Sequence, residues 1–171
     1  MNIRLNHFFF RRDVLKVAPE LLGKLLVRKY DDGTTVSFMI TEVEAYRGEE
    51  DLACHASKGK TPRTSVMYEP GGILYIYLIY GMYWMMNIVT GPADHPQAVL
   101  IRNIEGYDGP GKLTRHLKID KTFNKEDLTS STRIWLEDTG LRPGYATSPR
   151  IGVDYAGDHW KNVPWRFIIK S

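Results

Sequence analysis

The chain of 171 residues contains a single cysteine, Cys54. One thiol cannot form an internal disulfide or supply a cysteine-rich zinc site, which excludes disulfide-stapled secreted domains and zinc fingers. The histidines are few and not clustered, so we expect no metal ion and no cofactor. A reducing cytoplasm is the compartment that fits this composition best.

Other features are absent as well. No internal repeat, low-complexity tract or Pro/Gly/Ser-rich linker divides the sequence, so residues 1–171 are expected to form one domain. The segment Met1 to Asp13 has no apolar stretch followed by a small-residue cleavage site, which argues against a signal peptide. The net charge is only +3, which permits a polyanionic partner without requiring one.

A long charge-free run extends from Gly71 to Ala93 and is long enough to cross a bilayer. Polar and aromatic residues are nevertheless spread through it, and Gly81 interrupts it near its middle. Tyrosine belongs at membrane interfaces rather than throughout a bilayer core. The run therefore predicts two buried strands joined by a tight turn, and no membrane association.

Hydrophobic periodicity predicts more strands than helices. Residues 13–26 have helical spacing, with Pro19 marking an interruption or a fresh helix start. The turn Asp31-Asp32-Gly33 separates two strands in a hairpin. Further strands are expected at 73–79, 83–89, 98–104, 133–136 and 165–169, and short helices after Gly111 and at Lys125 to Leu128. The prediction is an α+β fold with a curved, barrel-like antiparallel sheet, a protruding β-hairpin and peripheral helices.

Two carboxylates end the strand that starts near Val36. Side chains alternate between faces of a strand, so Glu42 and Glu44 should continue the apolar face of Val36, Phe38 and Ile40. A carboxylate in that position is partly desolvated and suited to accepting a proton near neutral pH. The alternative is that both glutamates simply lie where the strand emerges into water.

Arg102 gives the same pattern on another strand. It should share a face with Ala98, Leu100 and Ile104, where an arginine needs an anionic partner. Glu42 or Glu44 is the obvious one. The pair could equally be structural.

The tip of the charge-free hairpin is Tyr80-Gly81-Met82-Tyr83. Large side chains beside the glycine of a tight turn are expected to project into solvent, where an aromatic ring can act as a wedge between stacked bases. Packing of this edge against another element is the alternative.

More aromatic side chains occur near these positions, namely Tyr46, His55, Tyr75 and Tyr77. They would suit a flat, electron-poor ligand such as an alkylated purine, and they would suit a core equally well. The sequence Gly109-Pro110-Gly111-Lys112 could present backbone N–H groups and a lysine to a phosphate, although it is too short for a P-loop.

Several ordered motifs together resemble the alkyladenine (3-methyladenine) DNA glycosylase family. The most specific runs from Pro70 through Tyr83 to Asn87. The resemblance extends from about Phe8 to Lys170, and its remaining motifs are Glu42-Val43-Glu44-Ala45-Tyr46 with Asp51 and His55, Thr61-Pro62-Arg63, Val99-Leu100-Ile101-Arg102, Gly109-Pro110-Gly111-Lys112-Leu113, Arg150-Ile151-Gly152-Val153 and Pro164-Trp165-Arg166-Phe167.

The resemblance implies a catalytic centre. Glu44 would be the general base that activates a water for attack on C1′ of a flipped nucleotide. Arg102 would help to hold that water and the carboxylate. No lysine or N-terminal amine is expected to attack the sugar, so the product would be an intact abasic site.

The resemblance also implies the DNA-binding groups. Tyr46, His55 and Tyr77 would sandwich the extruded base, and Asn87 would disfavour ordinary guanine. Tyr80, with Met82, would fill the gap left in the duplex. Phosphates would be contacted by Lys60, Arg63 and Lys112. The expected partner is double-stranded DNA containing damaged purines, bound by a monomer in the cytoplasm, at the nucleoid if the source is bacterial.

In one respect the chain departs from the family, which usually carries a longer polar insertion between Glu105 and Gly109. Two other functions stay open from sequence: a catalytically silent damage-binding module and a hydrolase of free nucleosides. A silent damage-binding module would not need both Glu44 and Arg102. A hydrolase of free nucleosides would not need an exposed Tyr80.

Overall fold

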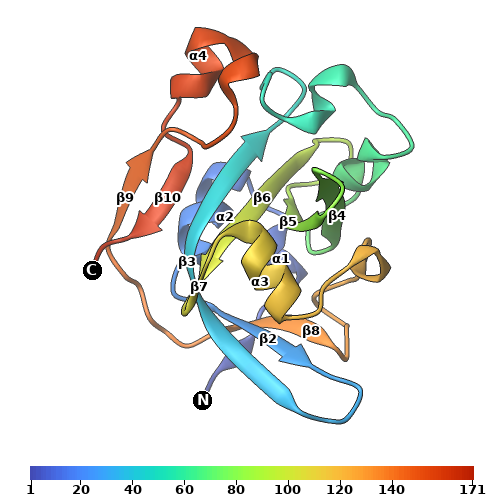
Figure 1. Cartoon of the computed structure of the whole chain (residues 1–171), viewed down its shortest axis with the longest axis vertical. Helices are drawn as coiled ribbons and strands as arrows, with labels where there is room; N and C mark the ends of the chain where they lie inside the picture. Colours follow the sequence, from blue (N-terminus) through green and yellow to red (C-terminus); the bar gives the residue numbers. More distant parts are fainter.

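The computed structural model describes all 171 residues and is built around one antiparallel sheet. Ten strands form it, with a main path in the order β1-β8-β2-β3-β6-β5-β4 that does not close (Figure 1). The α+β prediction is confirmed. The strands are β1 (Ile3–Arg4), β2 (Leu25–Lys29), β3 (Thr35–Arg47), β4 (Leu74–Ile79), β5 (Tyr83–Thr90), β6 (Gln97–Ile104), β7 (Tyr107–Asp108), β8 (Ile134–Asp138), β9 (Tyr145–Ser148) and β10 (Arg166–Ile169).

The helices are short and lie around the sheet. They are α1 (His7–Phe10), α2 (Val14–Leu21), α3 (Pro110–His116) and α4 (Gly157–Asn162), with single 3₁₀ turns η1 (His55–Lys58), η2 (Thr64–Tyr68), η3 (Lys121–Phe123) and η4 (Asp154–Ala156). In Figure 1, α2 lies behind the central strands and α3 in front of them. Pro19 lies within α2, which continues to Leu21, so it neither interrupts the helix nor starts a new one.

Both predicted hairpins form. β2 pairs with β3 across the Asp-Gly turn, where Gly33 has φ +90°. β4 pairs with β5 from Leu74 opposite Ile88 to Ile79 opposite Tyr83. The charge-free run is therefore a hairpin, and no helix of this protein has the length and apolar character needed to cross a membrane.

One predicted helix is wrong. Residues 125–128 follow η3 as a turn, and they bond to the outer strand of the sheet. Lys125 N donates to Leu74 O at 2.8 Å, and Leu128 N donates to Gly72 O at 2.8 Å. β4 is the end of the strand order and needs partners for its free edge. Those tertiary bonds use the backbone groups that a helix would have paired internally.

The longest strand, β3, links the two halves of the sheet. Its first half pairs with β2, and its second half pairs with β6 on one edge and β10 on the other. The β3–β6 register shifts between Ile40 and Glu42 and again between Glu42 and Val43. Such a bulge adds a residue to one strand and redirects the side chains that follow it.

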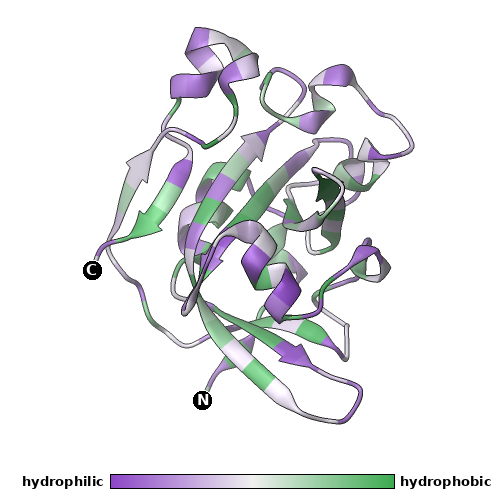
Figure 2. Cartoon of the chain, viewed as in Figure 1, coloured by the Kyte–Doolittle hydropathy of each residue, from purple (hydrophilic) through white to green (hydrophobic).

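Apolar side chains form one large core and a smaller cluster. The large core holds 26 buried residues from α2, α3 and one face of the central strands, including Val43, Ile88 and Ile101. The smaller cluster of eight buried residues includes Cys54, Met67 and Tyr75 on the other face. Figure 2 shows hydrophobic residues along the central strands and α2, with hydrophilic residues prevailing in α4.

Candidate active site

Glu44 lies on a different face of the sheet from the one that strand alternation predicts. Ile40 belongs to the large core, and so do Val43 and Ala45, because the bulge reverses the alternation between them. Glu42 and Glu44 therefore do not continue the face of Val36, Phe38 and Ile40. They point to the opposite face.

The same irregularity corrects the prediction for Arg102. Ile104 joins the large core together with Val99 and Ile101, so it does not share a face with Arg102. The register passes from Asn103, opposite Glu42, to Ile101, opposite Val43, and leaves Arg102 outside regular pairing. The irregular pairing of β3 with β6 thus brings Arg102 close to Glu42 and Glu44.

Glu44 is fully buried, with no exposed surface. Its Oε1 accepts a hydrogen bond from Tyr46 Oη at 2.9 Å and one from Arg102 Nη1 at 3.4 Å. Its Oε2 accepts the backbone N–H of Ile151 at 2.6 Å. Donors on both oxygens thus hold the carboxylate in one orientation.

Glu42 occupies a different electrostatic environment. Arg166 on β10 donates to Glu42 Oε1 at 2.6 Å, whereas Arg102 Nε lies 3.8 Å from Glu42 Oε2. Arg166 also donates to Pro149 O at 2.9 Å, so Glu42 helps to tie β10 to the loop that follows β9. Arg102 Nε is buried and has no hydrogen-bond partner in the protein.

Aromatic rings line the same face beside Glu44. The centroids of His55 and Tyr77 are 4.6 Å apart with planes 62° apart, and His55 Nδ1 is 2.9 Å from Tyr75 Oη. Burial, reinforced by Arg63 and Lys58, lowers the pKa of His55 to about 4, so its ring is neutral at pH 7. Burial and the nearby Glu44 charge hold the Tyr46 pKa well above its usual value. The Tyr77 pKa is raised, chiefly by burial.

Asn87 lies on this face too, opposite Leu100 on β6 and Tyr75 on β4. It is buried, and its Nδ2 donates to Tyr75 O at 3.2 Å. That bond fixes the amide orientation and leaves Oδ1 as the group that can meet a ligand.

The tip of the β4–β5 hairpin projects into solvent. Tyr80 is 83% exposed and Met82 is 60% exposed. Tyr80 and Gly81 both have positive φ, at 54° and 67°, as a two-residue hairpin turn requires. A tyrosine in that conformation is strained, and strained residues that persist are concentrated at functional positions.

The predicted phosphate-contacting residues are all exposed, but two of them stand over aromatic rings. The Arg63 guanidinium lies 5.2 Å from the Tyr77 ring centroid, and the Lys60 ammonium lies 5.4 Å from that of Tyr68. Lys112 is on α3, which packs against β5 through a close approach of Gly111 to the Tyr83 ring. Arg63 is therefore exposed to solvent and also contacts Tyr77, one of the aromatic residues beside Glu44.

Sequence reasoning assigned no role to several groups around Glu44. They are Ile151, whose backbone N–H bonds the carboxylate, Arg166, and the fully buried pair of Asp51 with Arg150. Their motifs were visible, but a charged residue in a loop usually implies exposure. No local pattern showed that these charges would be buried together.

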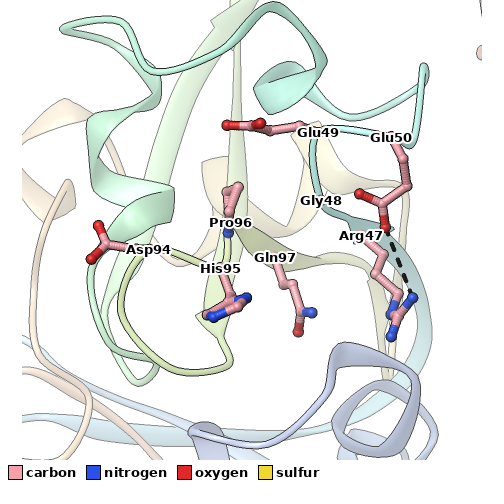
Figure 3. A pocket seen from close by; sticks show the side chains of 8 residues that line it. All are labelled: Arg47, Gly48, Glu49, Glu50, Asp94, His95, Pro96 and Gln97. Carbon is pink, nitrogen blue, oxygen red and sulfur yellow. Dashed lines mark ion pairs between the residues drawn. The ribbon is translucent and has the colours of Figure 1, made fainter.

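A polar pocket at the end of β3 is separate from this constellation (Figure 3). Its lining has no Phe, Tyr, Trp or aliphatic hydrophobic side chain, and His95 is its single aromatic ring. Arg47 and Glu50, neighbours in its lining, form an ion pair at 3.9 Å. No group of three or more metal-ligating side chains occurs in the structure.

The short connection after Glu105 closes as a tight turn at Gly106, and Asn103 Oδ1 accepts Gly109 N at 2.7 Å. In place of a long insertion, Tyr107 stacks on His116 with centroids 3.9 Å apart.

Comparison with known proteins finds a matching family and relatives over most of the chain. The sequence matches the family described as "Methylpurine-DNA glycosylase (MPG)" over residues 8–108 and 103–171. It is 47% identical to a protein of Sodalis glossinidius over 97% of this chain and 96% of the relative, and 45% identical to one of Borreliella burgdorferi over 98% and 96%. A protein of Psychrobacter cryohalolentis is 41% identical over 88% of this chain and 84% of its own. All three carry the name "Putative 3-methyladenine DNA glycosylase".

Proposed function

This chain belongs to the methylpurine-DNA glycosylase family, and from that premise we propose how it excises a base. It is a DNA N-glycosylase, a hydrolase that acts on DNA. It hydrolyses the N-glycosidic bond of an alkylated or deaminated purine that has been flipped out of duplex DNA. Glu44 activates the attacking water, and the protein acts as a monomer on chromosomal DNA in the nucleoid.

The observation that carries this proposal is the position of Glu44. Its carboxylate lies on the same face as the aromatic groups of Tyr46, His55 and Tyr77, beside Arg102. A base held between those rings would present its sugar to the carboxylate. Arg102, whose Nη1 donates to Glu44 Oε1, would help to hold the attacking water and the carboxylate.

The charges of the pocket favour a damaged purine. A purine alkylated at N3 or N7 is a cation and already a good leaving group, so for such a substrate the enzyme needs a base more than an acid. Neutral His55 adds no positive charge opposite such a ligand. Tyr46 and Tyr77 keep their protons and offer electron-rich ring faces. Asn87, held by its bond to Tyr75 O, would disfavour ordinary guanine by crowding its exocyclic amine.

The exposed hairpin supports action on duplex DNA. A base can reach an enclosed carboxylate only after it leaves the stack, which costs a few kcal/mol and least for damaged pairs. Tyr80 and Met82 would fill the gap and keep the duplex open. Exposed cations at Lys60, Arg63 and Lys112 would contact phosphates, which hold DNA without reading its sequence.

The test is base release from duplexes that each carry one lesion, 3-methyladenine, 7-methylguanine, hypoxanthine or etheno-adenine. We expect abasic sites in intact strands, no inhibition by EDTA and no covalent complex trapped by borohydride. A trapped adduct, or breaks without alkali, would show that an amine attacks the sugar. Damage binding without base release would identify a silent binding module, and release from free nucleosides would remove the duplex requirement.

A further inference from the structure

A fully buried ion pair lies beside Glu44 and takes no part in the mechanism above. Arg150 donates to both carboxylate oxygens of Asp51, with Nη1–Oδ2 at 2.6 Å and Nη2–Oδ1 at 2.9 Å, and neither side chain has any exposed surface. The Asp51 oxygens also accept the backbone N–H groups of Arg47 and Ala53, each at 3.0 Å. The pair therefore ties the loop containing Arg150 to the loop that follows β3.

The arginine also connects two other segments. Its Nη1 donates to Ala45 O at 3.0 Å, and its Nη2 donates to Trp160 O in α4 at 3.1 Å. Taking two charges out of water is costly, and a buried ion pair is often no more stabilising than an apolar pair of the same volume. Net stability is thus a weak explanation for this arrangement, and positioning is a better one.

Two of the three partners of Glu44 depend on the placement of Arg150. The next residue, Ile151, donates its backbone N–H to Glu44 Oε2 at 2.6 Å, while its side chain is 49% exposed and does not anchor it. The Arg150 guanidinium also lies 4.9 Å from the ring centroid of Tyr46, whose hydroxyl donates to Glu44 Oε1 at 2.9 Å. One guanidinium thus fixes a peptide N–H and a phenol on opposite oxygens of the same carboxylate.

We propose that the Asp51–Arg150 pair positions Glu44 for water activation, by holding the Ile151 peptide and the Tyr46 ring against its carboxylate. Arg150 and Asp51 are positioning residues, since neither touches the reacting atoms. The inference rests on the proposed role of Glu44 as the base.

The test compares Arg150→Lys and Asp51→Asn with the wild type in single-turnover excision from a hypoxanthine duplex. Lysine keeps the charge but cannot make the forked contact, and asparagine keeps the shape but loses the charge. We expect the maximal rate to fall about tenfold to a hundredfold, because misplacement by an ångström costs that much. The duplex concentration at half-maximal rate should stay within about twofold, since no group that binds DNA is removed.

Two further readouts separate positioning from general support. Hydrogen exchange at the Ile151 amide should accelerate in Arg150→Lys while amides in the large core keep their protection. In a Glu44→Gln background, Arg150→Lys should change the residual rate by less than about twofold, because groups acting through one another are not additive. Arg133→Lys is the matched control, because Arg133 also donates to both carboxylate oxygens of one residue, Glu126, each at 3.0 Å. We expect the Arg133→Lys variant to keep the excision rate within about twofold of the wild type.

The outcomes are distinct. If Glu44→Gln keeps its activity, the proposed function itself fails. If Glu44→Gln is inactive but Arg150→Lys excises at the wild-type rate, or slows only in proportion to its unfolded fraction, the positioning role fails alone. Failure of both the Arg150 and the Asp51 variants to fold would assign the pair to stability and overturn the inference.

Discussion

The two faces of the central strands differ in what they bury. One face carries Val43, Ile88 and Ile101 into a large apolar core. The other carries Glu44, Asn87 and a set of aromatic rings, with buried charges held by hydrogen bonds. Apolar burial stabilises a fold without requiring particular partners, whereas each buried charge needs specific donors. The apolar core and the residues of the proposed active site therefore lie on opposite sides of the same strands.

The largest expected effect is on the functional face. Glu44→Gln should lower the single-turnover excision rate by about a hundredfold or more, because an amide cannot take a proton from water. Binding to damaged duplex and the urea midpoint should change little. The control is Glu42→Gln, whose main partner is Arg166, and its rate should fall far less. More than about a tenth of the wild-type rate in Glu44→Gln would contradict the assignment.

Next in size is a substitution on the core face. Ile101→Ala removes a fully buried side chain from the large core and should lower the free energy of unfolding by about 2–5 kcal/mol, as measured by urea titration. At a temperature where the variant stays folded, its excision rate should be close to the wild type. Ile3→Ala is the matched control, and since Ile3 is 69% exposed, its effect should stay within about 0.5 kcal/mol. A folded but inactive Ile101→Ala would show that the two faces are not separable.

The hairpin tip provides a smaller effect that depends on the substrate. Tyr80→Ala should slow excision from duplex DNA by about tenfold and from single strands much less, because the wedge acts only where a stack must stay open. Its stability should be unchanged or slightly improved, since Tyr80 is exposed and strained. Equal losses on both substrates would place Tyr80 in the pocket or in packing instead.

The smallest effect concerns discrimination. Asn87→Ser should raise the release of guanine or guanine-derived lesions relative to hypoxanthine by severalfold, while overall activity is retained. The measurement is the ratio of the two rates in one preparation. An unchanged ratio would mean that Asn87 serves mainly to bond Tyr75 O.

Much of the fold could be predicted from sequence because its signals are local. The Asp-Gly turn predicted the β2–β3 hairpin, and Gly81 within an uncharged run predicted the β4–β5 hairpin, both of which form. The helix expected at Lys125 does not form, because those backbone groups bond to β4. The local pattern favoured a helix, but hydrogen bonds to a strand distant in the sequence determined the structure of this segment instead.

For the active site, the sequence by itself determined the residue types and, through family motifs, Glu44, Arg102 and the aromatic residues around them. Only the tertiary structure decided which face they occupy. The paired register shifts reverse the alternation after Ile40 and turn Glu44 away from the large core. It also decided what holds Glu44, since Asp51 and Arg150 meet across 99 residues of chain. Alternation and turn chemistry act between neighbours, but a bulge and a buried ion pair exist only when distant strands and loops have packed.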